Sequence, residues 1–109
     1  VLKKMIEADV LVMATPVYFY TMNAQMKVLI DRTCSSYTEL TNKDFYFIAT
    51  AADGNKDCIK RTIEGFRAFL DCLDGANEKA VLAATGVWNS GDVKNTHYMK
   101  DAFELGKHV

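Results

Sequence analysis

Residues 15–21 (TPVYFYT) are the part of the chain whose residue types best suit ligand binding. They include the single proline of the sequence, which fixes one backbone angle, and the consecutive aromatic residues Tyr18, Phe19 and Tyr20. Together these residues make a rigid wall with flat sides. Such a wall suits a planar ring system, whose faces favour stacking and whose edges need backbone N–H and C=O groups at fixed positions. The same side chains could instead cover the end of the core or form an oligomer contact.

The remaining reactive residue types do not show the spacing of a catalytic or metal site. Cys34, Cys58 and Cys72 are odd in number and widely spaced, which favours reduced thiols over a disulfide framework or a Cys-x-x-Cys metal site. His97 and His108 have no nearby serine, cysteine or paired carboxylate in the sequence that would suggest a triad. We therefore assign no catalytic residue and no metal ligand.

Three short apolar runs, at residues 10–14, 45–49 and 80–84, are continuous rather than alternating, which is typical of strands covered on both faces. The segments between them carry apolar residues at helical spacing. Met22, Met26, Leu29, Ile30 and Thr33 mark the face of one helix, and Ile59, Ile63, Phe66, Leu70 and Leu73 mark the face of a second. We expect Gly75 to end the second helix as a left-handed cap and Thr96 to open a last helix as its N-cap.

Strands that alternate with helices imply right-handed crossovers, so the sequence predicts an α/β fold with a parallel sheet and helices on both faces. In open sheets of this kind, ligands bind beyond the carboxyl ends of the strands. This rule draws attention to the segment that follows each apolar run. In addition to residues 15–21, these are residues 51–54 and a glycine-flanked segment with Trp88, which could cover a ligand pocket or a subunit contact.

The beginning of the chain reads as the continuation of a longer protein. It starts with Val1 rather than methionine, and residues 2–7 look like the last turns of a helix. The first apolar run contains no charge that would protect an exposed strand edge, so missing N-terminal strands or a second copy of the chain should pair with it. We therefore expect a fragment with three strands and their helices, and a homo-oligomer.

Length and composition exclude several classes of protein. A chain of 109 residues that is half hydrophobic can bury one core, so we expect a single domain. The 13 basic and 14 acidic residues are spread along the chain, which leaves no basic stripe for nucleic acid. No apolar run approaches the roughly 18–20 residues that span a bilayer. We expect a cytoplasmic protein that binds neither nucleic acid nor membrane.

Two segments carry a resemblance to a known family. Residues 8–19 (ADVLVMATPVYF), followed by Gln25, Lys27, Asp31 and Arg32, resemble the central segment of the NAD(P)H-dependent FMN reductases and their iron–sulfur flavoprotein relatives. Residues 86–96 (GVWNSGDVKNT) resemble the connection after the last strand in the same group. The resemblance implies a flavodoxin-like fold in which residues 1–109 form the C-terminal part of a single FMN-binding domain.

In this family the Pro-Val-Tyr loop holds the isoalloxazine ring of FMN, and the loop after the next strand approaches the ring from its other side. The cofactor-binding residues that the resemblance implies are Thr15, Pro16, Val17, Tyr18, Phe19, Tyr20, Asp53 and Gly54. Residues 51–54 depart from the family pattern because they lack the run of glycines found in many relatives. The family's phosphate loop, and any iron–sulfur cysteine cluster, would lie upstream of Val1.

The resemblance implies a flavin-dependent oxidoreductase that passes electrons from NAD(P)H through FMN to a small acceptor, such as a quinone, a free flavin or a metal ion. Hydride passes directly from the nucleotide to the flavin, so the transfer needs no acid or base from the protein. Two alternatives stay open: a flavodoxin-type electron carrier, and a structural or interaction fragment without cofactor. The near-neutral net charge of -1 favours the reductase over the strongly acidic carriers.

Overall fold

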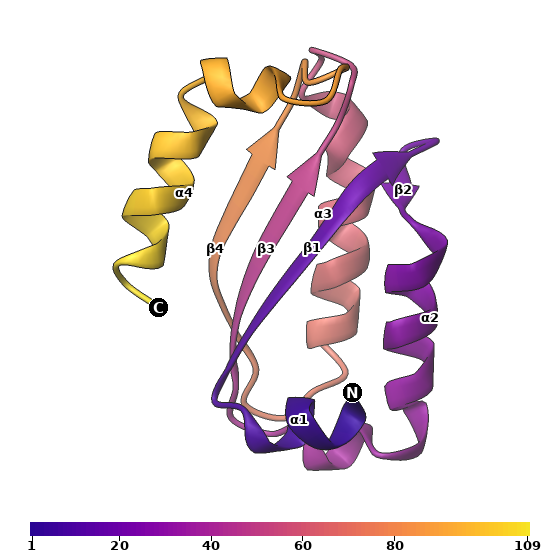
Figure 1. Ribbon diagram of the computed structural model, residues 1–109. Helices are drawn as coiled ribbons and strands as arrows, with labels where there is room; N and C mark the ends of the chain where they lie inside the picture. Colours follow the sequence, from indigo (N-terminus) through magenta and orange to yellow (C-terminus); the bar gives the residue numbers. More distant parts are fainter.

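The computed structural model describes residues 1–109 and contains one four-stranded sheet, in the order β2-β1-β3-β4 (Figure 1). The strands are β1 (Val10–Tyr18), β2 (Thr21–Met22), β3 (Asp44–Thr50) and β4 (Asn77–Ala84). The α-helices are α1 (Leu2–Glu7), α2 (Ala24–Arg32), α3 (Asp57–Leu70) and α4 (Tyr98–Gly106), and short 3₁₀ helices cover Thr33–Ser35, Tyr37–Glu39 and Asp92–Asn95. None of the helices is both long and apolar enough to cross a membrane.

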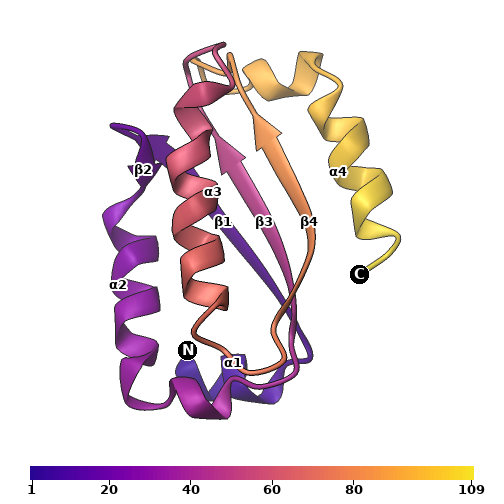
Figure 2. The ribbon, with the colours of Figure 1, turned by 180° about the vertical axis from the view of Figure 1, so that it is seen from behind.

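Strands β1, β3 and β4 run parallel, and only β2 is antiparallel, paired with the end of β1. The connections between the parallel strands run through α2 and α3, which lie against the same face of the sheet (Figure 2). Helix α4 lies beside β4, at the edge of the sheet far from β2 and α2 (Figures 1 and 2). This arrangement confirms the predicted α/β fold class.

The core lies between the sheet and α3. Phe45 and Phe47 of β3 are completely buried, and the ring of Phe47 stacks on that of Phe66 from α3, with 4.5 Å between ring centroids. Phe69 meets Phe45 edge to face, with 6.2 Å between their centroids. Full burial of each aromatic side chain contributes roughly 1.5–3 kcal/mol. This aromatic layer makes β3 and α3 the rigid centre on which the loops at either end depend.

Strand β1 is longer than the sequence predicted, and the expectation of a loop at residues 15–20 is wrong for its first part. Pairing with β3 continues to Pro16, opposite Thr50, and the antiparallel pairs Val17–Met22 and Tyr18–Thr21 then close a hairpin. Proline is tolerated here because β1 is an edge strand over residues 10–16, where the missing N–H breaks no ladder on its outer side. Only the two residues between Tyr18 and Thr21 form the turn.

The prediction that all strands are covered on both faces also fails for β1. Met13 and Thr15 are buried on the side of α2 and α3, whereas Val12 and Ala14, on the opposite face, are exposed. On that opposite face the chain supplies only α4, which contacts β4. A continuous apolar run shows that a strand can be buried on both sides, but the neighbouring elements decide whether it is.

Two helix ends differ slightly from the prediction. Gly75 has the expected left-handed backbone, with φ of +67°, but α3 already ends at Leu70. A Cβ at position 75 would lie only 2.3 Å from Asn42 Oδ1, so the turn needs glycine for space as well as for conformation. The hydroxyl of Thr96 accepts the N–H of Tyr98 at 3.3 Å, as an N-cap would, although the cap position itself is His97.

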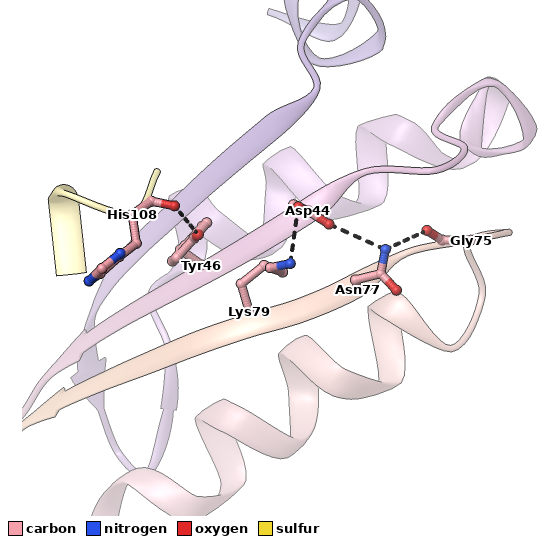
Figure 3. Close-up of polar contacts among 6 residues, drawn as sticks. All are labelled: Asp44, Tyr46, Gly75, Asn77, Lys79 and His108. Carbon is pink, nitrogen blue, oxygen red and sulfur yellow. Dashed lines mark hydrogen bonds and ion pairs between the residues drawn. The ribbon is translucent and has the colours of Figure 1, made fainter.

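Polar side chains at the amino ends of β3 and β4 are paired with one another (Figure 3). The carboxylate of Asp44 lies 3.4 Å from Nζ of Lys79 and accepts a hydrogen bond of 3.2 Å from the amide of Asn77. Tyr46 points away from the aromatic core, and its hydroxyl donates to the backbone carbonyl of His108 at 3.1 Å. This last bond ties the end of the chain, after α4, to the face opposite α3.

The buried side chain of Lys43 lies at the same end of the sheet. Its amine donates to the carbonyl oxygens of Ile6 and Ala8, at 2.7 and 2.6 Å. These carbonyls end helix α1, where the unpaired C=O groups and the helix dipole favour a positive charge. Lys43 therefore holds the C-terminal end of α1 against the amino end of β3.

Candidate functional site

Three segments meet beyond the carboxyl ends of the parallel strands: the β1–β2 hairpin, the loop after β3 and the loop after β4 (Figure 1). They enclose a cavity of about 210 Å³. Its lining is apolar except for one carboxylate, and consists of Val17, Phe19, Tyr20, Ala51, Ala52, Asp53, Cys58 and Trp88. The fold thus brings together the three segments that the rule for open α/β sheets singled out in the sequence.

The tip of the hairpin has an unusual backbone. Phe19 and Tyr20 have φ angles of +50° and +69°, in the left-handed region that side-chain-bearing residues rarely adopt. A two-residue hairpin turn that follows the twist of its strands needs φ above zero at both positions, and for this reason glycine and asparagine are usual there. Two aromatic residues instead cost about 1–2 kcal/mol each. Backbone strain of this kind is concentrated at functional sites.

Buried hydrogen bonds hold the base of the hairpin. Thr15 is only 3% exposed, and its hydroxyl accepts the N–H of Asn23 at 3.0 Å while donating to the carbonyl of Pro16 at 2.8 Å. Asn23 in turn caps α2 by accepting the N–H of Met26 at 2.9 Å. The side chain of Thr15 therefore lies inside the protein, and the residues after it supply the exposed surface of this segment.

The aromatic side chains of the site are exposed to solvent. Tyr18 is 60% exposed, Phe19 97% and Trp88 78%. These fractions rule out the interpretation that the hairpin aromatics cover the end of the core, and Trp88 likewise packs against little of this chain. Exposed aromatic residues at one end of a sheet are typical of surfaces that bind another molecule, whether a ligand or a protein.

The loop after β3 presents backbone donors to the site. The N–H groups of Ala52, Asp53 and Gly54 donate to no group of the protein. Two backbone hydrogen bonds nevertheless fix the loop. The carbonyl of Ala51 accepts the N–H of Val87 at 3.1 Å, and the carbonyl of Asp53 accepts the N–H of Gly86 at 3.0 Å. Three consecutive free N–H groups in a fixed loop suit a ligand whose edge carries hydrogen-bond acceptors.

Sequence reasoning missed Cys58 as a residue of the cavity. It lies in the first turn of α3, directly after the loop, and its position next to that loop was the available signal. Burial raises the pKa of the Cys58 thiol, and the negative charge of Asp53 raises it further. Cys58 is therefore a neutral thiol and not an activated nucleophile. His97 lies outside the cavity, exposed and 3.6 Å from Asp101.

Four larger cavities lie elsewhere and contain none of the predicted site residues, and two of them exceed the others in volume. One, of about 620 Å³, separates α1 from α2, and another, of about 640 Å³, is lined in part by Cys34 and Cys72. Size alone would favour these two. The smaller cavity remains the stronger candidate because strained backbone, exposed aromatic rings and free backbone donors coincide there.

Comparison with known proteins identifies the family of the chain. The family model described as NADPH-dependent FMN reductase matches residues 1–73. The chain is 34% identical, over 117 aligned residues, to an iron–sulfur flavoprotein of Methanocaldococcus jannaschii. That alignment covers all of this chain and 61% of the relative, so the chain spans about three-fifths of the length of this curated protein.

Two solved structures have the same fold. The Trp repressor binding protein of Bacillus subtilis aligns with a TM-score of 0.80 and 23% identity, over 93% of this chain and 69% of that one. A protein of P. pentosaceus described as an NADPH-quinone reductase aligns with a TM-score of 0.64 and 18% identity, over 91% of this chain and 68% of that one. The fold is flavodoxin-like, and the chain belongs to the NADPH-dependent FMN reductase family.

Proposed function

We propose that the carboxyl end of this sheet binds the isoalloxazine ring of FMN, in a flavin-dependent oxidoreductase that takes electrons from NAD(P)H and delivers them to a small acceptor. One observation carries the proposal. The exposed aromatic tip of the hairpin and the loop residues Ala52 and Asp53, whose N–H groups are free, lie around one cavity at the carboxyl ends of the strands. Family membership and the resemblance of residues 8–19 support the choice of flavin over other planar ligands.

The residues present fit the ring part of this cofactor. An isoalloxazine has apolar faces and an edge rich in hydrogen-bond acceptors, and the site offers aromatic side chains for the faces and backbone donors for the edge. Complete ligand pockets usually have about 300–1,000 Å³, so a cavity of about 210 Å³ matches a ring held on one side rather than a whole mononucleotide. These residues thus contribute the ring contacts.

FMN, when bound, supplies the redox chemistry, since it accepts hydride from a reduced nicotinamide and passes electrons onward. The residues of this chain bind the flavin ring, orient it and exclude water from it. Phe19 and Tyr20 of the hairpin and Trp88 of the loop after β4 provide apolar surface. The loop after β3 holds its donors at fixed positions. The neutral thiol of Cys58 adds an apolar contact without bringing a second negative charge beside Asp53.

The test of this proposal uses the full-length protein. We expect its absorbance spectrum to show oxidised flavin, and we expect NADPH or NADH to bleach this spectrum in an anaerobic stopped-flow experiment. The variant His97→Ala should be reduced at the same rate, because hydride transfer needs no protein acid or base. A protein that binds no flavin would contradict the proposal. A flavin that neither nucleotide reduces would favour an electron carrier.

We also propose that the protein is a cytoplasmic homo-oligomer. The outer edge of β1 has no strand partner over residues 10–16, and Val12 and Ala14 are exposed beside it. An unpaired apolar edge favours association with another strand, which N-terminal strands upstream of Val1 or a second copy of the chain can supply. Free, exposed thiols at Cys34 and Cys72 suit a reducing compartment. Light scattering of the purified protein tests the oligomer, and a monomer at micromolar concentration would contradict it.

A further inference from the structure

Arg61 differs from Lys60 and Arg67, the other cations within α3, because it has no carboxylate partner and is free to bind an anion. Lys60 pairs with Asp57 one turn away, and Arg67 uses two of its nitrogens to bind the carboxylate of Glu78. Arg61 is exposed, has no carboxylate within 4 Å and donates no hydrogen bond. A guanidinium without such partners is an unsatisfied set of five hydrogen-bond donors.

The position of Arg61 is nevertheless defined. Its guanidinium carbon lies 5.7 Å from the centroid of the Tyr20 ring, in a cation–π contact. Tyr20 lines the candidate cavity, and its carbonyl accepts a hydrogen bond from the buried hydroxyl of Thr62 at 3.4 Å. Stacking uses the flat face of the guanidinium and leaves the N–H groups at its edge available. The strained hairpin thus holds a cation with free donors against one of the residues that line the site.

We propose that Arg61 is a specificity-determining residue that binds a phosphate group of the electron donor, the 2′-phosphate that distinguishes NADPH from NADH. This inference rests on the function proposed above. A guanidinium binds phosphate through two parallel hydrogen bonds, which a lysine cannot reproduce. Tyr20 acts as a positioning residue, because its ring holds the guanidinium in place. The unfavourable backbone of Tyr20 is then explained, since a glycine in the turn would remove the ring on which Arg61 stacks.

Phosphate in this system has two sources, the donor nucleotide and the phosphate of FMN itself. The two are separable because each has a natural counterpart without the group: NADH for NADPH, and riboflavin for FMN. If Arg61 binds the donor, its loss changes the preference for NADPH over NADH and leaves the preference for FMN over riboflavin unchanged. If Arg61 binds the cofactor, its loss changes the preference for FMN over riboflavin and leaves the preference for NADPH over NADH unchanged, and the proposal is wrong.

The experiment measures kcat/KM for NADPH and for NADH in the full-length flavoprotein and in Arg61→Gln, Arg61→Lys and Tyr20→Gly. We expect Arg61→Gln to lower the ratio of the two values about tenfold, the effect of one charge-assisted hydrogen-bonded contact on a partly exposed rim. Arg61→Lys should keep part of the preference, because its charge remains. Tyr20→Gly should lower the ratio less than Arg61→Gln does. Flavin content and the affinities for FMN and riboflavin are measured for each protein.

Arg32→Ala is the matched control, because Arg32 is also exposed and lacks a carboxylate partner but lies at the far end of α2. It should leave the ratio unchanged. An unchanged ratio in Arg61→Gln, in a protein that still binds FMN and is reduced by both nucleotides, would overturn this inference alone. If neither nucleotide reduces the bound flavin of the unmodified protein, the proposed function itself fails.

Discussion

The two ends of the parallel strands use polar groups in opposite ways. At the amino ends, Lys43 donates to two helix carbonyls, Asp44 is bound by Lys79 and Asn77, and Tyr46 holds the backbone of the last residues (Figure 3). At the carboxyl ends, three backbone N–H groups and the guanidinium of Arg61 donate no hydrogen bond to the protein, and aromatic rings are exposed to solvent. At the amino ends the polar groups are paired within the protein, whereas at the carboxyl ends hydrogen-bond donors stay available for a ligand.

The comparison separates stability from function. A buried donor or acceptor without a partner costs about 1–3 kcal/mol, so the paired groups at the amino end stabilise the fold. The same cost is avoided at the carboxyl end only because its free groups are exposed to water. Substitutions of the paired groups at the amino end should therefore change the free energy of unfolding and not ligand binding. Substitutions at the carboxyl end should change ligand binding, and should change the free energy of unfolding only where they relieve the backbone strain of the hairpin.

The largest effect is expected at Lys43. Replacement by Met keeps the apolar stem but leaves the carbonyls of Ile6 and Ala8 without their donor. Each hydrogen bond from a charged group contributes roughly 1.5–3 kcal/mol, so Lys43→Met should lower the free energy of unfolding by about 3 kcal/mol. Urea denaturation measures this change. The exposed Lys4→Met is the control, and equal midpoints for the two variants would show that Lys43 does not stabilise the fold.

At the opposite end, Tyr18→Ala removes exposed aromatic surface from the hairpin. We expect FMN to bind about tenfold more weakly in the full-length protein, since an aromatic stacking contact contributes on the order of 1 kcal/mol beyond the area it buries. The free energy of unfolding should hardly change. Met99→Ala, an exposed apolar residue on α4, is the control. Flavin fluorescence titration decides the matter, and equal affinities in both variants would place the ring elsewhere.

A smaller effect of the opposite sign is expected at the tip of the hairpin. Phe19 is almost completely exposed and has a φ of +50°, so its side chain gains little from packing while its backbone is strained. Phe19→Gly should raise the free energy of unfolding by about 1 kcal/mol. Tyr20→Gly should raise the free energy of unfolding less than Phe19→Gly does, because it also removes the contact with Arg61. Thermal denaturation that shows Phe19→Gly to be destabilised would contradict the assigned strain.

The smallest effect concerns the ion pair between α3 and β4. The hydrogen bonds from Arg67 hold the pKa of the Glu78 carboxyl below its ordinary value of 4.5. A lowered carboxyl pKa stabilises the folded state above the unfolded pKa, and this stability is lost as the pH falls through the folded pKa. Since the side chains are 55% and 28% exposed, Glu78→Gln should cost less than about 1 kcal/mol at pH 7.

This difference between Glu78→Gln and the unmodified protein should shrink as the pH falls through the lowered pKa of the folded state, and disappear once the carboxyl is protonated in both the folded and the unfolded state. Urea denaturation at a series of pH values measures it. Glu104→Gln serves as control, since its partner Lys107 lies on the same exposed helix end and contributes little. A difference that grows as the pH falls would show that the ion pair does not stabilise the fold.

Most of the fold could be predicted from the sequence because its signals are local. The apolar runs and the helical spacing between them located the three parallel strands and α2, α3 and α4, and the general rule for open sheets indicated which loops lie near a ligand. The hairpin could not be predicted in the same way. Its closure depends on Tyr18 pairing with Thr21 and on the buried hydroxyl of Thr15, which reaches Asn23 eight residues later.

The sequence by itself determined the fold class and the segment that carries the aromatic residues, because periodicity and residue type act over a few neighbouring positions. The resemblance of residues 8–19 and 86–96 to a known family indicated the family. Only the tertiary structure decided which side chains line the cavity together and which polar groups have no hydrogen-bond partner in the protein. Cys58 and Trp88 join the hairpin there, and Arg61 stacks on a ring 41 positions earlier in the chain. Contacts between such distant residues follow from how parallel strands and their helices pack, which no local pattern encodes.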